Sequence, residues 1–148
     1  QELLGKQAIK VPLLQRGKGV YSVYVLVPKP DLTMRPILDL RYLNRSIKRQ
    51  HFKMTTLQGV ITLLRKGDYL ATLDLKDAYL HIPMCRGHRK NLQFMKGNTR
   101  YQFKVLAFRV KSAPREFTKC LAAVAAHLRR QEIHVYPYLD DWLVKARS

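Results

Sequence analysis

The segment VYPYLDDWLV, residues 135–144, decides how the rest of the sequence is interpreted. Two aspartates, Asp140 and Asp141, stand side by side in a run of aromatic and branched aliphatic residues that is typical of β-strands. Pro137 weakens the first half of this run as a strand, because proline cannot donate a hydrogen bond to a neighbouring strand. We therefore expect two short strands that bend at the aspartates.

The chain is strongly basic, which makes a pair of adjacent carboxylates unusual. Its 148 residues include 28 Lys+Arg and only 10 Asp+Glu, for a formal net charge of +18. A charge excess of this size repels itself in the folded state, so a polyanionic partner is expected. No apolar run approaches the roughly 20 residues that a membrane-spanning helix needs, and no signal-peptide pattern opens the chain. Nucleic acid is therefore favoured over a membrane as the partner.

The two cysteines indicate the cellular compartment. Cys85 and Cys120 are 35 positions apart and lie outside any C-x-x-C pattern. Such cysteines are typical of reduced thiols, not of a zinc site or a disulfide framework. We expect an intracellular protein, in the cytoplasm or nucleus, that is not secreted.

Strands and helices alternate along the chain without a strict βαβ rhythm. Strands are predicted at residues 20–29, 35–40 and 69–75, and a hairpin at 91–103 whose turn is Gly97-Asn98. A helix capped by Thr55 or Thr56 is expected to run to a stop at Gly67. A longer helix is expected from Ser112, with one apolar stripe formed by Phe117, Leu121, Val124 and Leu128. This order predicts an α+β fold with an antiparallel sheet.

A second acidic cluster matches the first. The segment LATLDLKDAYLHIP, residues 70–83, places Asp74 at the end of a predicted strand and Asp77 three residues later. If this strand lies beside the one that ends at Tyr138, Asp74 meets Asp140 and Asp141 at one edge of the sheet. Three close carboxylates raise one another's pKa values unless a cation neutralises them. Two Mg²⁺ ions, held by carboxylates and phosphate oxygens, would fit such a site.

The individual motifs leave plainer interpretations open. An Asp-Asp pair between two strands is also an ordinary exposed turn. Asp74 and Asp77 by themselves could cap a helix. Only further motifs in a particular order favour catalysis over these alternatives.

Such an order is present. The segments RPILDLRYLN, LDLKDAYLHIP, HRKNLQF, YQFKVLAF, SAPREFTK and YLDD follow one another along the chain. In this order and spacing the chain resembles the reverse transcriptases of retroelements, most closely those of DIRS-type and gypsy-like retrotransposons. The resemblance implies one reverse-transcriptase domain fragment over residues 1–148, an α+β fingers–palm fold whose antiparallel palm sheet packs on helices. Fingers are expected at roughly 1–66 and 82–106, and palm at roughly 67–81 and 107–148, with the thumb absent.

The resemblance also implies an activity. A reverse transcriptase is an RNA-directed DNA polymerase, which uses two Mg²⁺ ions, deoxynucleoside triphosphates and an RNA or DNA template with a primer. Asp74, Asp140 and Asp141 would be the catalytic and metal-binding residues. Asp74 and Asp140 would ligate the ions directly, with Asp141 more peripheral.

Two further groups of residues follow from the resemblance. Tyr79 would lie under the incoming sugar and exclude a 2′-hydroxyl, although on sequence alone it is also a plausible core aromatic. The residues expected to bind the nucleotide are Lys29, Arg35, Asp77, Ala78, Tyr79, Phe108 and Arg109. The residues expected to contact template or primer are Arg41, Asn44, Lys48, Arg49, Arg89, Lys90 and Tyr138. The basic residues among them could equally form a solvated face.

The chain departs from the family pattern before its long helix. Where Leu-Pro-Phe-Gly-Leu is usual, this chain has Ala107 in place of proline and Arg109 in place of glycine. Glycine permits a positive φ and close approach of a ligand. We expect Arg109 to crowd the incoming base or sugar, and its backbone not to reach the same conformation. Contact with phosphate is the less favoured alternative. The turn KPDLT, residues 29–33, also lacks the glycine common in relatives.

Three functions remain open. The first is a fingers–palm segment of a polymerase, expected to be weakly active or inactive by itself because the segment would lack a thumb and its nucleotide pocket is altered. The second is a non-catalytic relic or reused domain that keeps the polymerase fold and binds nucleic acid by charge. The third, a metal-dependent nuclease, explains the aspartates and the charge but not the ordered motifs.

Overall fold

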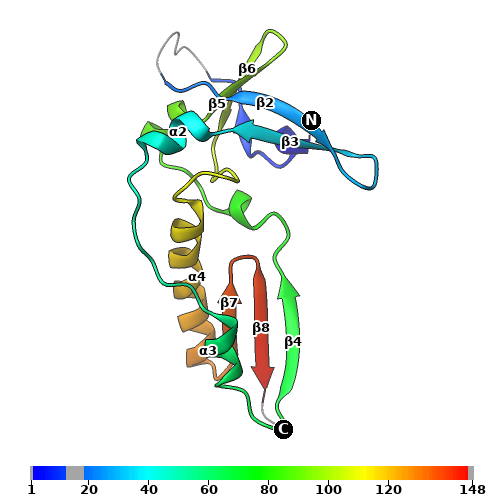
Figure 1. The fold of residues 1–148 in the computed structure, drawn as a ribbon, viewed down its shortest axis with the longest axis vertical. Helices are drawn as coiled ribbons and strands as arrows, with labels where there is room; N and C mark the ends of the chain where they lie inside the picture. The colour runs from blue at the N-terminus through cyan, green and yellow to red at the C-terminus, as the bar shows by residue number, and fades with distance from the viewer. Residues whose placement is uncertain (1, 13–18, 147–148) are drawn as a thin grey trace. The chain divides into compact units, whose positions relative to one another are not determined.

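The structure, a computed structural model, describes residues 2–12 and 19–146 of the chain. These residues form two compact units. Unit 1 comprises Gln1–Arg49 and Tyr79–Ala113, and unit 2 comprises Gln50–Ala78 and Pro114–Ser148. Each unit is assembled from two stretches that are distant in the sequence, so both depend on long-range contacts (Figure 1). Assignment of fingers and palm to these units stays a prediction.

Unit 1 is built mainly from antiparallel strands. Its elements are α1 (Glu2–Gly5), β1 (Ile9–Lys10), β2 (Val23–Pro28), β3 (Met34–Asp39), α2 (Arg41–Ser46), the 3₁₀ helices η1 (Ala78–His81, whose first residue belongs to unit 2) and η2 (Arg86–Asn91), β5 (Gln93–Lys96) and β6 (Thr99–Phe103). β1, β6 and β5 form one sheet in that order, and β2 pairs with β3. The predicted hairpin is confirmed: Lys96 pairs with Thr99, and Gly97 has φ +59° in the two-residue loop.

Aromatic side chains form the centre of unit 1. Phe94, only 2% exposed, stacks on Tyr24 of β2 with 5.0 Å between ring centroids and on Tyr101 of β6 with 5.4 Å. The backbone N–H of Ser22 donates to the carbonyl of Gln93 at 2.8 Å, which joins the start of the β2 segment to β5. Stacked rings of this kind contribute beyond the area they bury. Phe94 therefore connects the β2–β3 hairpin with the other sheet.

An ion pair precedes helix α2. Asp39 accepts hydrogen bonds from Nε of Arg41 at 2.9 and 3.1 Å, from Nη2 at 2.5 Å and from the Arg41 backbone N–H at 3.1 Å. These bonds, led by those from the Arg41 side chain, lower the pKa of Asp39 from its ordinary 3.8 to about 2. Arg41 is therefore held locally, at the junction between β3 and α2.

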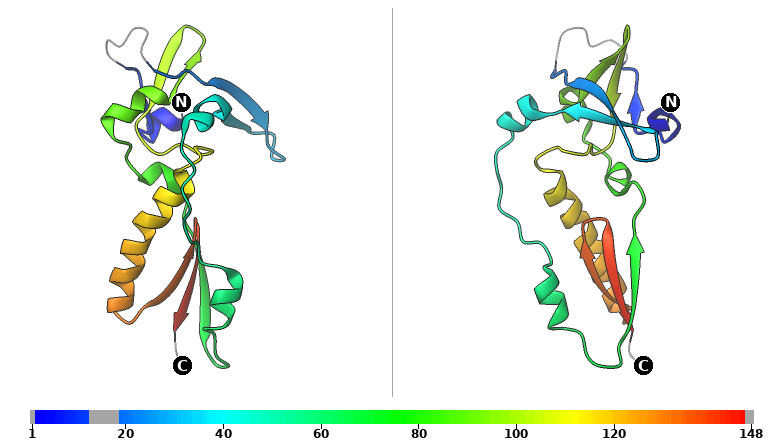
Figure 2. Two further views of the ribbon diagram at one scale, coloured as in Figure 1. Left: turned by 60° about the vertical axis from the view of Figure 1, so that its left-hand side comes forward. Right: turned by 45° about the vertical axis from the view of Figure 1, so that its right-hand side comes forward.

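Unit 2 contains one sheet and two helices. Its elements are α3 (Leu57–Ile61), β4 (Tyr69–Asp74), α4 (Ala113–Arg130, whose first residue belongs to unit 1), β7 (His134–Tyr138) and β8 (Asp141–Ala146). The sheet is antiparallel in the order β4-β8-β7. The two helices lie on opposite faces of it (Figure 2). Pro137 is in β7, an edge strand, where its missing N–H costs no ladder bond.

The apolar stripe predicted for α4 is only partly correct. Phe117 and Leu121 are buried as expected, but Val124 is 49% exposed and Ala125 is buried instead. The buried row advances by four residues from Ala113, and such a row inclines to the helix axis. Spacing along the sequence fixes the period of a helix but not the angle at which the helix crosses the sheet.

α4 contains no span capable of crossing a membrane, nor does any other helix among residues 2–12 and 19–146.

The helix at Thr56 is shorter than predicted. The Thr56 hydroxyl accepts from the backbone N–H of Gly59 at 3.1 Å, so the predicted cap is confirmed. The helix ends at Ile61, however, and the expected stop at Gly67 is wrong. Lys145 explains the early end: its Nζ donates to the Leu63 carbonyl at 2.8 Å, which fixes a turn where another helical turn would otherwise follow.

Lys145 and Asp68 form a buried ion pair in unit 2. Their side chains are each 7% exposed and 3.4 Å apart. Asp68 also accepts from the backbone N–H of Arg65 at 2.8 Å. The pair therefore joins β8 to the turn that leads into β4, the two strands that carry Asp141 and Asp74.

Replacing Lys145 by methionine is expected to destabilise the protein by about 3 kcal/mol, because removal of one partner leaves the other charge buried. Urea unfolding, followed by circular dichroism, measures this change. Lys119→Met, at an exposed position of α4, is the matched control and should change stability by about 0.5 kcal/mol or less. Equal effects of the two substitutions would contradict a structural role for the pair.

The Asp39–Arg41 pair predicts acid sensitivity in a defined window. Because the pKa of Asp39 is lowered from 3.8 to about 2 on folding, the pair stabilises the folded state fully above about pH 4, and this stabilisation disappears as pH falls toward 2. We expect Asp39→Asn to flatten the dependence of the urea midpoint on pH between 4 and 2. The control is Glu132→Gln, which removes an exposed carboxylate without touching the Asp39–Arg41 pair. Parallel curves for the wild type and Asp39→Asn would contradict the prediction.

Candidate functional site

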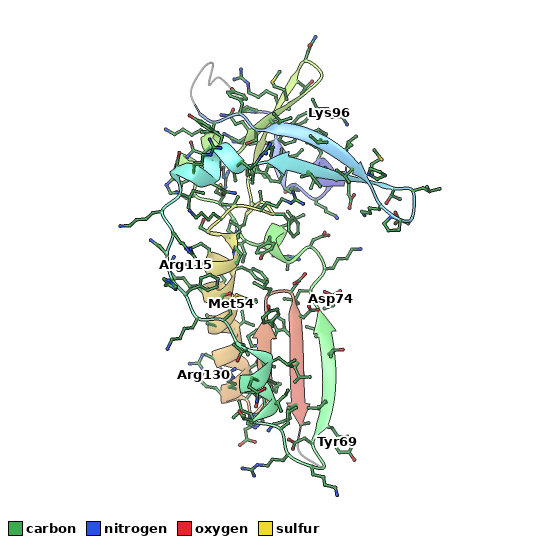
Figure 3. The ribbon with its side chains drawn as sticks, in the orientation of Figure 1. Met54, Tyr69, Asp74, Lys96, Arg115 and Arg130 are labelled. Carbon is green, nitrogen blue, oxygen red and sulfur yellow. The ribbon has the colours of Figure 1, made fainter. Side chains whose placement is uncertain are left out.

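The two acidic clusters meet at one end of the sheet in unit 2. Asp74, the last residue of β4, is directly opposite Asp141, the first residue of β8. Leu75 continues this ladder, and its N–H donates to the carbonyl of Asp140 at 2.9 Å. Figure 3 shows Asp74 at the end of β4, beside the turn that joins β7 and β8. All three aspartates are exposed.

The neighbour of β4 differs from the one assumed from the sequence. β4 pairs with β8, which begins at Asp141, and not with β7, which ends at Tyr138. The assumption was wrong because local patterns do not specify which strand of a hairpin becomes the central one. The aspartates still come together, since both strands of the hairpin reach the same turn.

The register places two carboxylates on one face of the sheet. Directly opposed residues of an antiparallel pair point to the same side, with about 5 Å between their Cβ atoms. Asp141 is paired with Asp74 on one side and with Tyr138 on the other. Like charges in such a pair repel each other. A bound cation would remove this repulsion.

The turn itself is strained. Leu139 and Asp140 form the two-residue connection between β7 and β8, and Leu139 has φ +52°. A positive φ at the first position of such a turn is favourable for glycine and costly for a bulky residue. Strain of this kind persists only where the surrounding structure enforces it, and it is common at functional sites.

The donor chemistry of these aspartates fits a hard divalent cation. Mg²⁺ prefers carboxylate and phosphate oxygens and keeps several waters. Among the described residues, however, no three His, Cys, Asp or Glu side chains are grouped closely enough to hold a metal ion by themselves. Asp74 and Asp141 could therefore supply two of the ligands of a cation, and phosphate oxygens and water would have to complete its coordination.

Two of the expected nucleotide-binding residues touch each other in unit 1. The rings of Tyr79 and Phe108 meet edge to face, with 5.1 Å between centroids and an interplanar angle of 88°. Tyr79 is half-buried and Phe108 is exposed. Ala78, which precedes Tyr79, is buried, and Asp77 has φ +54°. Tyr79 is therefore neither a fully buried core aromatic nor a free surface ring.

Arg109 adopts a left-handed backbone conformation, which an arginine at this position was not expected to reach. It has φ +71°, in the left-handed region that glycine reaches easily. The expectation that an arginine could not reach this conformation is therefore wrong. Asn44 explains the difference: its Nδ2 donates to the carbonyl of Arg109 at 2.8 Å, and its Oδ1 accepts from the N–H of Lys111 at 2.8 Å.

The β2–β3 turn also replaces glycine with a strained residue. The Lys29 N–H donates to the Thr33 carbonyl at 2.8 Å, and Leu32 has φ +62°. Asp31 accepts from the N–H of Thr33 at 3.1 Å and from its hydroxyl at 2.6 Å. Arg35 follows in β3, opposite Val27. The turn thus keeps its form without glycine because Asp31 supplies hydrogen bonds.

The expected nucleic-acid contacts fall into two groups. Arg41 is paired with Asp39, and Nε of Arg89 donates to the Met84 carbonyl at 2.9 Å, so both have structural partners. Asn44 also belongs to this group, because its side chain binds the loop around Arg109. The exposed remainder comprises Lys48, Arg49, Lys90 and Tyr138. Tyr138 is opposite Asp141 in the sheet of unit 2.

Two residues near these positions were not predicted. Lys111 supports the Arg109 loop, through its N–H and through a bond from Nζ to the Ile47 carbonyl at 3.0 Å. No local pattern could have revealed it, because its partners lie more than 60 residues away. Trp142, the chain's single tryptophan, follows Asp141 and is 5% exposed. Its indole N–H has no partner within the described ranges.

Comparison with known proteins gives a consistent result. Residues 27–148 match the family described as reverse transcriptase (RNA-dependent DNA polymerase). The transposon Tf2-3 polyprotein of Schizosaccharomyces pombe is 24% identical over 143 residues, which cover 96% of this chain and 11% of the polyprotein. The transposon Tf2-7 polyprotein of the same organism is similar to the same extent. The chain thus spans about a tenth of the length of these relatives.

Solved structures share the fold. The native protease-reverse transcriptase of prototype foamy virus has a TM-score of 0.77 and 22% identity, over 99% of this chain and 19% of that one. The foamy viral protease-reverse transcriptase in complex with dsDNA has a TM-score of 0.80 and 20% identity, over 99% of this chain and 29% of that one. The α+β fold expected from the sequence is confirmed. Because the family match covers most of the chain, from the β2–β3 hairpin through the paired aspartates, this protein belongs to the reverse transcriptase family.

Proposed function

We propose that the chain carries part of the fingers and palm of an RNA-directed DNA polymerase, which adds deoxynucleotides to the 3′-hydroxyl of a primer on an RNA or DNA template. The observation that supports this most directly is the register that opposes Asp74 and Asp141 beside the turn of Asp140. Membership of the family and the net charge of +18 agree with it.

Asp74 and Asp140 would bind two Mg²⁺ ions directly, with Asp141 supporting them from the opposed position on β8. When bound, the ions would lower the pKa of the primer hydroxyl and stabilise charge on the leaving pyrophosphate. The opposed pair of carboxylates suits this role because its like charges favour a cation. Exposure of all three side chains leaves room for phosphate oxygens.

The residues of unit 1 would select and hold the nucleotide. Lys29 and Arg35, on the β2–β3 hairpin, would bind the triphosphate by charge-assisted hydrogen bonds. Tyr79 would lie under the sugar, held in place by its edge contact with Phe108. A fixed aromatic ring there would reject a 2′-hydroxyl by steric contact.

A second function, nucleic-acid binding without catalysis, is favoured by one specific observation. No group of three carboxylates or other metal-ligating side chains is assembled among residues 2–12 and 19–146. In this interpretation the basic surface would bind phosphate by charge alone. Primer extension distinguishes the two functions.

For primer extension, the chain is mixed with a labelled template-primer, Mg²⁺ and deoxynucleoside triphosphates. We expect weak, template-dependent extension that falls at least about 100-fold in Asp74→Asn, because a charge that stabilises the transition state is lost. Glu132→Gln, an exposed carboxylate of the same unit outside the site, is the matched control. No extension with either protein would favour the non-catalytic function, and template degradation without nucleotides would favour a nuclease.

Binding to nucleic acid is expected to depend steeply on salt and little on sequence. A protein that contacts about six phosphates loses roughly 10³-fold in affinity between 50 and 200 mM salt. Fluorescence anisotropy with two labelled duplexes of unrelated sequence measures this dependence. Affinity that hardly changed with salt would exclude charge-driven binding and thus weaken both proposed functions.

A further inference from the structure

The loop around Arg109 in unit 1 combines backbone strain with unusually complete support. A left-handed conformation is unfavourable for an arginine, so surrounding contacts must enforce it. Both functional ends of the Asn44 side-chain amide are used for this purpose, one on each side of Val110. Val110 itself is buried, which anchors the centre of the loop.

Asn44 is well placed to act as a fixed support. It lies in α2, is half-buried, and its backbone N–H donates to the Leu40 carbonyl at 2.8 Å. Lys111 adds a second connection to the same helix, because its Nζ donates to the Ile47 carbonyl at 3.0 Å. The loop is therefore held by hydrogen bonds to Asn44 within α2 and to Ile47, the residue that follows this helix.

The two cationic side chains of this loop, Arg109 and Lys111, differ in their contacts. Lys111 is engaged by Ile47, whereas the exposed Arg109 guanidinium makes no hydrogen bond or ion pair with any other described residue. Because its backbone is held in place, the Arg109 side chain starts from a defined position, and its planar guanidinium can bind phosphate through two parallel hydrogen bonds. A strained backbone that presents an exposed arginine without a side-chain partner among the described residues is suited to this role.

We propose that Arg109 is a phosphate-binding residue and that Asn44 is its positioning residue. The charge that replaces the family's glycine thus adds a contact to nucleic acid or to the triphosphate of a nucleotide. This deepens the proposed function, from which it takes only the identity of the ligand. It does not depend on whether the aspartates catalyse a reaction.

The first experiment compares Arg109→Gln with Arg130→Gln. Both remove one exposed arginine, and Arg130, at the end of α4 in unit 2 (Figure 3), serves as the control for net charge. Binding is measured by anisotropy for a labelled DNA duplex and by calorimetry for dATP. We expect Arg109→Gln to lower the affinity for one of these ligands about tenfold, as for loss of a charge-assisted hydrogen bond. Arg130→Gln should have a clearly smaller effect on that ligand.

The ligand that is weakened identifies the source of the phosphate. If affinity for the duplex falls, and the slope of log affinity against log salt is reduced by about 0.9, Arg109 binds the nucleic-acid backbone. If only the affinity for dATP falls, Arg109 binds the triphosphate. An unchanged affinity for both ligands, or equal losses in the two variants, would overturn the proposal. Either result leaves the Asp74→Asn test of catalysis unaffected.

The second experiment tests Asn44 by rescue. Asn44→Ala should lower the affinity for the same ligand as Arg109→Gln does. The double variant should bind that ligand no less tightly than Arg109→Gln alone, because the two residues act through one contact. Asn44→Ala should also lower the urea midpoint less in an Arg109→Gly background, since glycine needs no support at φ +71°. Additive losses in affinity, or equal shifts of the midpoint in both backgrounds, would refute the positioning role.

Discussion

The candidate site depends on one constraint, the antiparallel register of β4 and β8. This pairing sets Asp74 against Asp141 and brings the carbonyl of Asp140 within hydrogen-bonding distance of Leu75. A shift by one residue would move every side chain of β4 to the other face of the sheet. Asp74 would then point away from Asp141, so the chemistry proposed for the aspartates requires this register.

The register is maintained at its other end by charge. Lys145 of β8 reaches both the Leu63 carbonyl and the carboxylate of Asp68, just before β4 begins. An arrangement that separated Lys145 from Asp68 would leave a buried charge without its partner, which is costly, so the pair favours the register in which the two meet. In unit 2 it stands at the end of the sheet opposite the aspartates, so the pairing is fixed at both ends.

Backbone strain is concentrated near the segments that carry the family resemblance. Of the six non-glycine residues with positive φ in the described part of the chain, Asp77 and Leu139 lie in the ordered motifs, and Leu32 and Arg109 lie where the chain departs from the family pattern. Each needs support from its surroundings. At Arg109 that support is the Asn44 amide, and near Leu32 it is the Asp31 carboxylate. The chain has thus lost glycines common in its family without losing the backbone forms that glycine allows.

Much was predictable from the sequence because it depends on local order. Alternation, turn residues and helical spacing gave the hairpin at Gly97-Asn98, the Thr56 cap and the bend at Asp140. The ordered motifs gave the family. Only the tertiary structure decided that β8 and not β7 is the neighbour of β4, that α4 crosses at an angle that buries Ala125, and that Asn44 supports Arg109. Each of these is a contact between residues far apart in the chain, and no local pattern records the energy of such contacts.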